Sequence, residues 1–468
     1  MKVLLVIPPV TTQERYGKLS DVGTLYPPLG LAYIAAVAEQ SGHEVKVIDS
    51  EAMNYGYKEI MDIVRRFNPS VVGMQTFSTN IPRCHDMAKK LKEFNPEIKI
   101  VLGGAQVTVM PEYSMKEKEI DFIVYGEGER TFKQLLEALE RNTDLLKVKG
   151  IYWKKNNHII KNESQELIKN LDEVPMPARH LFPMQKYHSS AQLRGKRTLN
   201  IMTSRGCPFR CAYCSGHLTF GKTHRFHSTQ RVLDEIEIMI ETYGCDGIQF
   251  YDETLTANKN RVNELCDEII KRKLKFEWSC FTRVNLVDQE LLYKMKKAGC
   301  YQIFYGTESG VQELLNRIRK DITLEQSKKA IEMTKKAGIE SWCSFMLALP
   351  GETKEQSLQT IKFALELDPE YILFPITTPY PGTALHDIAK EHGRFIEDDW
   401  TKYMIWDKVV YLPNGRTEKD IRNTVKLAYR KFYLRPSYML RRAKSFAKLP
   451  PSKVLKLVRA GLVTIFRS

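Results

Sequence analysis

Short apolar runs alternate with amphipathic segments along the first 140 residues. The apolar runs fall at residues 3–7, 45–48, 70–74, 99–102 and 122–124, and helical spacing is found at 30–39, 57–67, 82–94 and 130–139. Because parallel strands need a crossover between them, usually a helix, five such alternations predict a doubly wound parallel sheet. Ligands bind such sheets at the carboxyl ends of the strands.

The predicted strand ends carry small residues and chain breakers. Ser78 and Thr79 follow the third run, and glycines follow the fourth and fifth, at 103–104 and 126–128. Glycine lets the backbone approach a ligand closely, so several such loops at one edge favour a large ligand with phosphate or amide groups. Each loop alone is equally explained by ordinary strand termination. The fingerprint G-x-G-x-x-G is missing after the first run, which disfavours NAD and FAD.

A second alternating region begins near residue 198. Six strands are predicted at 199–203, 247–251, 277–280, 302–305, 341–347 and 372–375, with helices at 229–242, 259–272, 289–297 and 324–337. Six β/α units predict a partial or complete β/α barrel, with function at the strand ends. The predicted organisation is an α/β domain at 1–140, a linker with a small hairpin at 141–194, a barrel at 195–390 and a helical region with a basic tail at 391–468.

Composition narrows the class of protein. The 468 residues are 43% hydrophobic and 27% charged, which is typical of globular domains. No apolar run approaches the roughly 20 residues that span a bilayer, and Pro8 and Pro9 interrupt the N-terminal run, so we expect a cytoplasmic protein. The net charge is +15, and residues 430–468 contain no Asp or Glu, so much of the excess belongs to the tail.

Three of the nine cysteines lie close together, directly after the first barrel strand. Cys207, Cys211 and Cys214 have the spacing C-x3-C-x2-C, which lets three sulfurs converge on one metal centre. A structural zinc or an ordinary iron–sulfur cluster would want a fourth protein ligand, for which His217 or His224 could be proposed. Otherwise one iron is left free to bind a substrate or cofactor.

This loop, with Tyr213 just before the third cysteine, resembles the radical S-adenosylmethionine (radical SAM) superfamily. Segments at 250–256, 306–310, 349–353 and 379–383 resemble further motifs of that superfamily. With an α/β domain before the barrel, nearly the whole chain except its tail resembles the cobalamin (B12)-binding class of radical SAM enzymes. No Asp-x-His-x-x-Gly occurs, so the histidine that ligates cobalt in other cobalamin proteins has no candidate, and a domain that has lost its corrin is the alternative.

The resemblance implies three cofactors. Cys207, Cys211 and Cys214 would hold a [4Fe–4S] cluster whose open iron binds S-adenosylmethionine (SAM), giving a 5′-deoxyadenosyl radical that abstracts hydrogen from an unactivated carbon. It assigns no catalytic residue beyond the cofactor ligands. The candidates for SAM are Tyr213, Asp252, Arg283, Glu308 and Ser344, and those for cobalamin are Ser78, Thr79, Gly103, Gly104, Gln106, Gly126, Glu127 and Gly128.

Several of these residues have plainer explanations. Asp252 could cap a helix, Arg283 could form an internal ion pair and Glu308 could be a solvent-facing loop acid. The other six cysteines are expected to be ordinary core residues. Three tyrosines could line a substrate cavity or pack in the core, namely Tyr301, Tyr305 and Tyr380.

Within the class that the chain resembles, methylation of an inert carbon is the expected reaction. We expect a hydrophobic substrate, such as an isoprenoid lipid or a tetrapyrrole, and a flavodoxin- or ferredoxin-like electron donor. The alternatives are an oxidative cyclase resembling the anaerobic Mg-protoporphyrin ester cyclase, or a non-methylating enzyme with a vestigial cobalamin domain. A methylthiotransferase or RNA modifier is disfavoured because a second cysteine triplet is absent, and a sensor would not need the SAM motifs.

The C-terminal tail mixes cations with apolar residues. Val454, Leu455, Leu457, Val458 and Leu462 lie among lysines and arginines, Lys448 included. Such segments are attracted to anionic lipid, which suggests peripheral docking on the inner face of the membrane. The alternative is a helix packed on the barrel. Nucleic acid is not expected, because no known binding module accompanies the charge.

Overall fold

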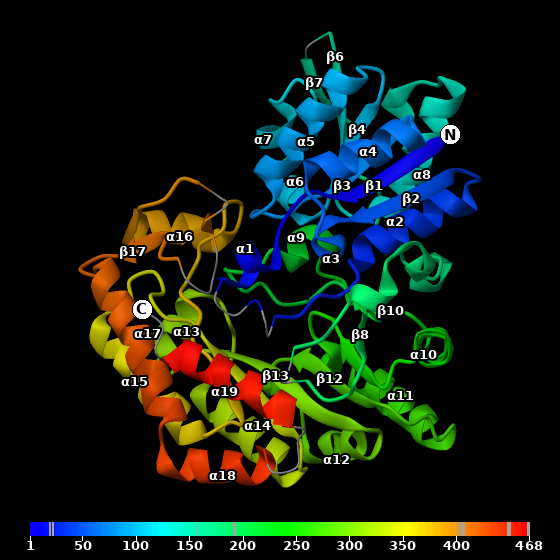
Figure 1. The fold of residues 1–468 in the computed structure, drawn as a ribbon. Helices are drawn as coiled ribbons and strands as arrows, with labels where there is room; N and C mark the ends of the chain where they lie inside the picture. Colours follow the sequence, from blue (N-terminus) through cyan, green and yellow to red (C-terminus); the bar gives the residue numbers. More distant parts are fainter. Residues whose placement is uncertain are drawn as a thin grey trace.

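The computed structural model describes residues 1–17, 20, 23–156, 158–190, 193–399, 402–403, 408–446 and 451–465, so Lys448 lies outside the described residues. Figure 1 shows two α/β units, one above the other, with the C-terminal helices α17 and α18 beside the second unit. None of the described helices is both long enough and apolar enough to cross a lipid bilayer.

The first unit contains the predicted doubly wound sheet. Its strand order is β2-β1-β3-β4-β5-β6-β7, in which β1 to β5 are parallel. The hairpin expected in the linker forms, and it pairs antiparallel with β5, so it continues this sheet. The strands are β1 (Lys2–Ile7), β2 (Glu44–Asp49), β3 (Val71–Gln75), β4 (Lys99–Gly103), β5 (Phe122–Val124), β6 (Ile151–Lys155) and β7 (His158–Lys161).

Helices cover both faces of this sheet, as the apolar strands require. In β1, Val3 and Leu5 join the core beneath α2 and α8, whereas Leu4 and Val6 join the core beneath α4 and α5. The helices are α1 (Thr12–Tyr16), α2 (Leu29–Gln40), α3 (Ser50–Met53), α4 (Tyr57–Phe67), α5 (Ile81–Phe94), α6 (Ala105–Val109), α7 (Pro111–Met115) and α8 (Gly128–Arg141).

The second unit is a partial β/α barrel, which confirms the predicted fold class. Six parallel strands are ordered β15-β14-β13-β12-β11-β8. They are β8 (Thr198–Ile201), β11 (Gly247–Phe250), β12 (Glu277–Thr282), β13 (Cys300–Glu308), β14 (Glu340–Phe345) and β15 (Tyr371–Leu373). The helices are α10 (Thr229–Tyr243), α11 (Lys259–Lys271), α12 (Gln289–Lys297), α13 (Gln312–Arg317), α14 (Leu324–Lys336) and α15 (Lys354–Leu367).

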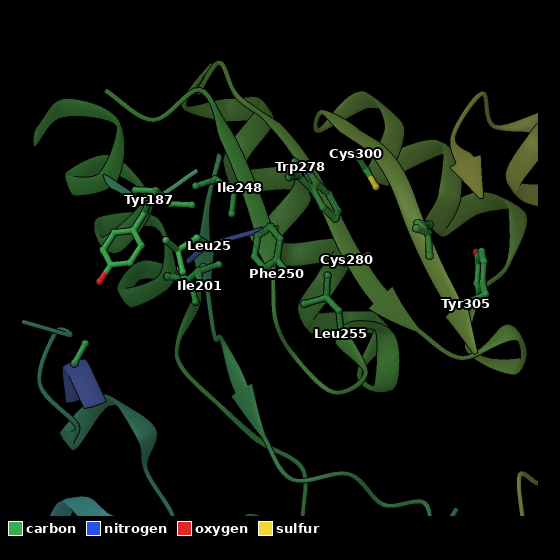
Figure 2. Packing of buried hydrophobic residues seen from close by; sticks show 14 of the residues in the cluster. Leu25, Tyr187, Ile201, Ile248, Phe250, Leu255, Trp278, Cys280, Cys300 and Tyr305 are labelled. Carbon is green, nitrogen blue, oxygen red and sulfur yellow. The ribbon is translucent and has the colours of Figure 1, made fainter. Parts of the chain in front are cut away.

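Alternate residues of these strands form the core against the helices. Figure 2 shows Phe250, Trp278, Cys280 and Tyr305 in this cluster. The hydroxyls of Tyr305 and of Thr334 in α14 lie 2.8 Å apart, so of the two alternatives for Tyr305, substrate cavity or core, the structure shows the core. The six cysteines outside the metal-binding motif are buried, as expected of core residues: Cys84, Cys245, Cys266, Cys280, Cys300 and Cys343.

The C-terminal region packs beside the barrel. The hydroxyl of Tyr429 in α17 accepts a hydrogen bond from the backbone N–H of Phe374, 3.0 Å away. Arg435, just before α18, and Arg441, within it, form ion pairs of 2.8 and 2.7 Å with Asp368. The elements are α16 (Ala384–His392), β16 (Gly393–Phe395), β17 (Tyr411–Pro413), α17 (Glu418–Tyr433), α18 (Pro436–Phe446) and α19 (Pro451–Ile465).

Candidate active site

The cysteine loop follows β8 and the short strand β9 (Ser204–Arg205). Gly206 opens the loop with φ +84°, a conformation that favours glycine, and an added Cβ would collide with the carbonyl oxygen of Thr223. Cys211 is buried, whereas Cys207 and Cys214 are half-buried. The loop therefore presents three thiols from a fixed backbone turn.

The chemistry of this donor set fits an iron–sulfur cluster. Burial raises the pKa of the Cys207 thiol and raises that of Cys214 to about 11, so binding a metal must release protons. No three His, Cys, Asp or Glu side chains within the described ranges form a group that could hold a single metal ion. Three thiols on one loop suit a four-iron cluster, whose ligand positions lie on separate iron atoms.

Arg283 connects the cysteine loop to the end of β12. Its Nη1 donates to Cys211 Sγ at 3.2 Å, and Nη2 donates to the carbonyl oxygens of Lys320 and Asp321. The guanidinium also lies 3.8 Å from the centre of the Phe209 ring. The structure thus places this predicted SAM residue against a cluster thiol, with Nη2 already engaged by two carbonyl oxygens.

Tyr213 and Glu308 meet beside the same loop. The Tyr213 hydroxyl donates to Glu308 Oε1 at 2.8 Å, and Lys320 Nζ donates to both groups, at 2.8 and 2.9 Å. Glu308 has φ +63° at the end of β13, where the register with β14 shifts, and its side chain is 8% exposed. Glu308 is therefore not a solvent-facing acid. Sequence reasoning missed Lys320, which carries no motif of its own.

Asp252 accepts hydrogen bonds from the residues that lead into the cysteine loop. It accepts hydrogen bonds from the N–H and hydroxyl of Thr203, at 3.1 and 2.8 Å, and from the hydroxyl of Ser204. Its Oδ2 is buried without a partner among the described residues. Ser344 lies opposite Gly306 on the neighbouring strand, and its carbonyl accepts a hydrogen bond from Thr307. All five predicted SAM residues thus lie at the barrel strand ends or on the loop that they support.

Two neighbouring cavities lie between the units, with volumes of about 320 and 230 Å³. Both are lined by Phe77, Ala105 and Ser215, so the cysteine loop faces the strand ends of the first sheet. The predicted cobalamin residues divide between them: Gly103, Gly104, Gly126, Glu127 and Gly128 line the first, and Ser78, Thr79 and Gln106 line the second. Tyr380 also lines the second cavity.

The cavity walls fit a ligand rich in amide groups. Three buried polar atoms have no hydrogen-bond partner among the described residues, namely Tyr33 Oη, Gln75 Oε1 and Gln106 Nε2. Such atoms are costly to bury unless a ligand or water satisfies them. Corrin carries amide side chains, so these residues would hold its rim. No histidine lines either cavity within the described residues.

An ion-pair network joins the two units beside the first cavity. Arg205 pairs with Glu129 at 2.6 Å and with Glu127 at 3.4 Å, and Arg225 pairs with Glu127 at 2.9 Å. The four side chains are at most 9% exposed. The carboxylate of Glu127 is thus engaged by two arginines and by the N–H of Ile168, which leaves its backbone to face the cavity. Sequence reasoning did not anticipate either arginine.

Two family models match this chain, one in each of its two α/β units. The B12 binding domain matches residues 19–136, and the Radical SAM superfamily matches residues 201–364. An uncharacterized methyltransferase of Pyrococcus horikoshii is 38% identical over 442 residues, which cover 94% of each chain. The chain belongs to the cobalamin-binding radical SAM family. It is a radical SAM enzyme whose cofactors are a [4Fe–4S] cluster, SAM and cobalamin.

Other relatives within the cobalamin-binding radical SAM family differ in reaction. The anaerobic magnesium-protoporphyrin IX monomethyl ester cyclase of Rubrivivax gelatinosus is 29% identical, over 94% of this chain and 78% of the cyclase. The hopanoid C-3 methylase of Methylococcus capsulatus is 26% identical, over 76% and 67%. The radical SAM methyltransferase TsrM of Kitasatospora setae shares the fold, with a TM-score of 0.72 at 16% identity over 93% and 89% of the two chains.

Proposed function

We propose that this enzyme methylates an unactivated carbon of a hydrophobic substrate, of the isoprenoid lipid or tetrapyrrole kind. The observation that carries the proposal is the first cavity, in which Ser215 and Gly216 of the cysteine loop face Gly104 and Gly126 of the first sheet. One cavity therefore adjoins both cofactor regions. When bound there, the cofactors supply hydrogen abstraction from carbon and a methyl group.

The protein's own side chains position and shield these groups. Glu308, kept beside the Lys320 ammonium, offers a carboxylate to the amino or hydroxyl groups of SAM. The aromatic rings of Tyr33, Phe77 and Phe220 line the first cavity and limit the access of water. A dry site is needed because water or other donors would quench a reactive carbon species.

An oxidative cyclase is the second candidate, because a cyclase relative matches 94% of this chain. The two reactions differ in their use of SAM. Methylation consumes two molecules of SAM for each product, giving one 5′-deoxyadenosine and one S-adenosylhomocysteine. Cyclisation without methyl transfer gives 5′-deoxyadenosine alone.

The test uses anaerobically reconstituted enzyme, a reductant, SAM labelled with a deuterated methyl group, and lipid and pigment extracts of cells that lack the gene. We expect a labelled product in the organic phase, with 5′-deoxyadenosine and S-adenosylhomocysteine in about equal amounts. Cys211→Ala supplies the inactive control. Release of 5′-deoxyadenosine with an unlabelled, cyclised product would replace the methylation proposal by the cyclase.

We also propose that α19 docks on anionic membrane. Leu455, Val458 and Leu462 recur at helical spacing, so they share one face, and they are 71%, 42% and 52% exposed. The absence of acidic residues from 430 to 468 complements anionic lipid. Because Arg435 and Arg441 are already paired with Asp368, α18 serves to anchor the segment on the barrel.

A vesicle assay tests this docking. The triple change Leu455→Ser, Val458→Ser and Leu462→Ser keeps the charge and removes the apolar face. We expect the unaltered protein to cosediment with vesicles of phosphatidylglycerol, and the triple variant to remain in the supernatant. Replacement of Leu146, which is 54% exposed on the first unit, is the control. Equal cosedimentation of the triple variant and the unaltered protein would refute the proposal.

A further inference from the structure

A row of five aromatic side chains crosses the second sheet. It consists of Tyr251, which directly follows β11, with Phe281, Phe304, Trp342 and Tyr371 of the next four strands in spatial order. Successive ring centres are 5.6, 4.7, 4.6 and 5.3 Å apart. Phe281, Phe304, Trp342 and Tyr371 are also direct register partners, so this aromatic row is one continuous layer of the sheet.

The aromatic row faces away from the helices. Its neighbours along the strands, such as Phe250, Cys280 and Cys343, belong to the core against the helices, which Figure 2 shows in part. Because side chains alternate along a strand, the aromatic row points to the opposite, inner face. None of its five rings belongs to a hydrophobic core cluster within the described residues.

Solvent reaches part of this layer. Tyr251 is 40% exposed, and Phe281 and Phe304 are half-buried, whereas Trp342 and Tyr371 are only 9% and 8% exposed. Aromatic rings that only pack a core would be covered by other apolar side chains. A contiguous apolar layer left partly open on an inner face is typical of a surface that a ligand covers.

The aromatic row lies directly below the cofactor residues. Two positions further along the same strands, Phe281 is followed by Arg283, which contacts Cys211, and Trp342 is followed by Ser344. Two residues of strand rise by about 6.6 Å, so a molecule lying on the row would be one layer from the cysteine loop. The Tyr26 ring of the first unit packs against Tyr251 at 5.8 Å, so the row begins at the junction of the units.

We propose that the aromatic row is the wall that binds the substrate, and that it takes an extended hydrocarbon moiety laid across the strands. The three rings that solvent reaches, Tyr251, Phe281 and Phe304, span two strand spacings, or about 10 Å. Phe281 and Trp342 are inclined by only 32° and 26° to Phe304 between them, so the rings stack along the row and present their edges. Ring edges carry weakly positive C–H groups, which attract apolar groups and π faces but offer no N–H or O–H donor to a phosphate.

The Trp342 indole is a buried polar group of the wall. The Trp342 side chain is 9% exposed, and its Nε1–H is buried without an acceptor among the described residues. The Tyr371 hydroxyl, in contrast, already accepts a hydrogen bond from Arg442. We therefore expect a single oxygen on the hydrocarbon to accept from Trp342. This inference rests on the proposed function for the fate of the bound molecule, but the binding itself does not require methylation.

Equilibrium dialysis of the anaerobically reconstituted holoenzyme measures this binding. The probes are radiolabelled geranylgeraniol, carried in cyclodextrin, and radiolabelled cytidine monophosphate as a polar comparison. We expect geranylgeraniol to be retained and cytidine monophosphate to pass freely. Phe304→Ala removes the central ring and should weaken geranylgeraniol binding about tenfold, while Phe304→Leu, which keeps most of the apolar volume, should weaken it less.

Tyr293→Ala is the matched control, because Tyr293 is 47% exposed on α12 and is not part of the aromatic row. It should bind geranylgeraniol as the unaltered enzyme does. Unchanged binding in Phe304→Ala, or equal retention of cytidine monophosphate by the unaltered enzyme, would overturn the proposed wall. Release of 5′-deoxyadenosine by the unaltered enzyme is measured separately; its absence would instead count against the proposed function.

Discussion

We expect the buried Arg205–Glu129 ion pair at the junction of the units to contribute several kcal/mol to the free energy of unfolding. Glu129→Gln removes one charge from a pair whose Oε1 to Nη2 distance is 2.6 Å and whose side chains are 3% and 9% exposed. Arg205 then keeps its charge in a buried site with only the longer contact to Glu127, at 3.4 Å. Breaking a buried pair in this way typically costs about 3–5 kcal/mol, and we expect the lower end because the amide oxygen of Gln can still accept a hydrogen bond.

The pH dependence follows from the same contact. Burial alone would raise the pKa of Glu129, but the charge and hydrogen bond of Arg205 outweigh it and hold the pKa below the ordinary value of 4.5. A carboxyl whose pKa is lower in the folded state stabilises the protein fully above its unfolded pKa, and loses this effect as pH falls through the folded value. The difference between the unaltered protein and Glu129→Gln should therefore be constant from pH 6 to 8 and shrink below about pH 4.5.

The assay is urea unfolding of the cofactor-free protein, with a double-mutant cycle of Glu129→Gln and Arg205→Met. The double variant should lose less unfolding free energy than the two single variants lose together, because it leaves neither Glu129 nor Arg205 charged. Glu173→Gln is the control: the Arg130–Glu173 pair has a similar distance of 2.7 Å but is 41% and 56% exposed, so its loss should cost less than about 1 kcal/mol. Equal losses of stability in Glu129→Gln and Glu173→Gln, or strict additivity in the cycle, would show that the buried Arg205–Glu129 pair contributes no more than an exposed pair.

Three further predictions concern the active site. Cys211→Ala should abolish 5′-deoxyadenosine release, whereas Cys84→Ala, in the core of the first unit, should not; equal activity of both would contradict the cluster assignment. Lys320→Met leaves the Glu308 carboxylate without its cation and should weaken SAM binding about 10- to 100-fold by equilibrium dialysis, while Lys328→Met, 51% exposed, should bind SAM normally. Gly306→Ala should also weaken SAM binding, because the added Cβ would lie 2.6 Å from Lys320 Nζ; unchanged affinity would show that the Lys320–Glu308 contact is not needed.

Most of the fold could be predicted because it depends on local pattern. Alternation of apolar strands with amphipathic helices predicted both parallel sheets and the strand ends at which Gly103, Gly126 and Glu308 lie. The hairpin β6–β7 was also predictable as a hairpin. Its attachment to β5 was not, because an antiparallel edge strand is chosen by pairing between distant segments.

The parts of the site that escaped prediction depend on contacts across the chain. Lys320 follows the turn after α13, between Arg319 and Asp321, which have φ values of +53° and +51°, and only the folded barrel brings its ammonium to Tyr213 and Glu308. Arg205 could not be singled out from the sequence, because its partner Glu129 lies 76 residues away in the first unit. The aromatic row could not be predicted either. Alternation along a strand assigns side chains to the two faces of the sheet, but it does not say which face solvent reaches.

We expect the thiolates of Cys207, Cys211 and Cys214 to hold a cluster with one iron open to SAM. Mössbauer spectroscopy of the enzyme reconstituted with ⁵⁷Fe, recorded before and after addition of SAM, tests it directly. We predict that SAM changes the spectrum of one iron in the cluster and leaves the other three unchanged. A spectrum insensitive to SAM, or a preparation that binds zinc in place of iron, would contradict an open-iron cluster at these three cysteines.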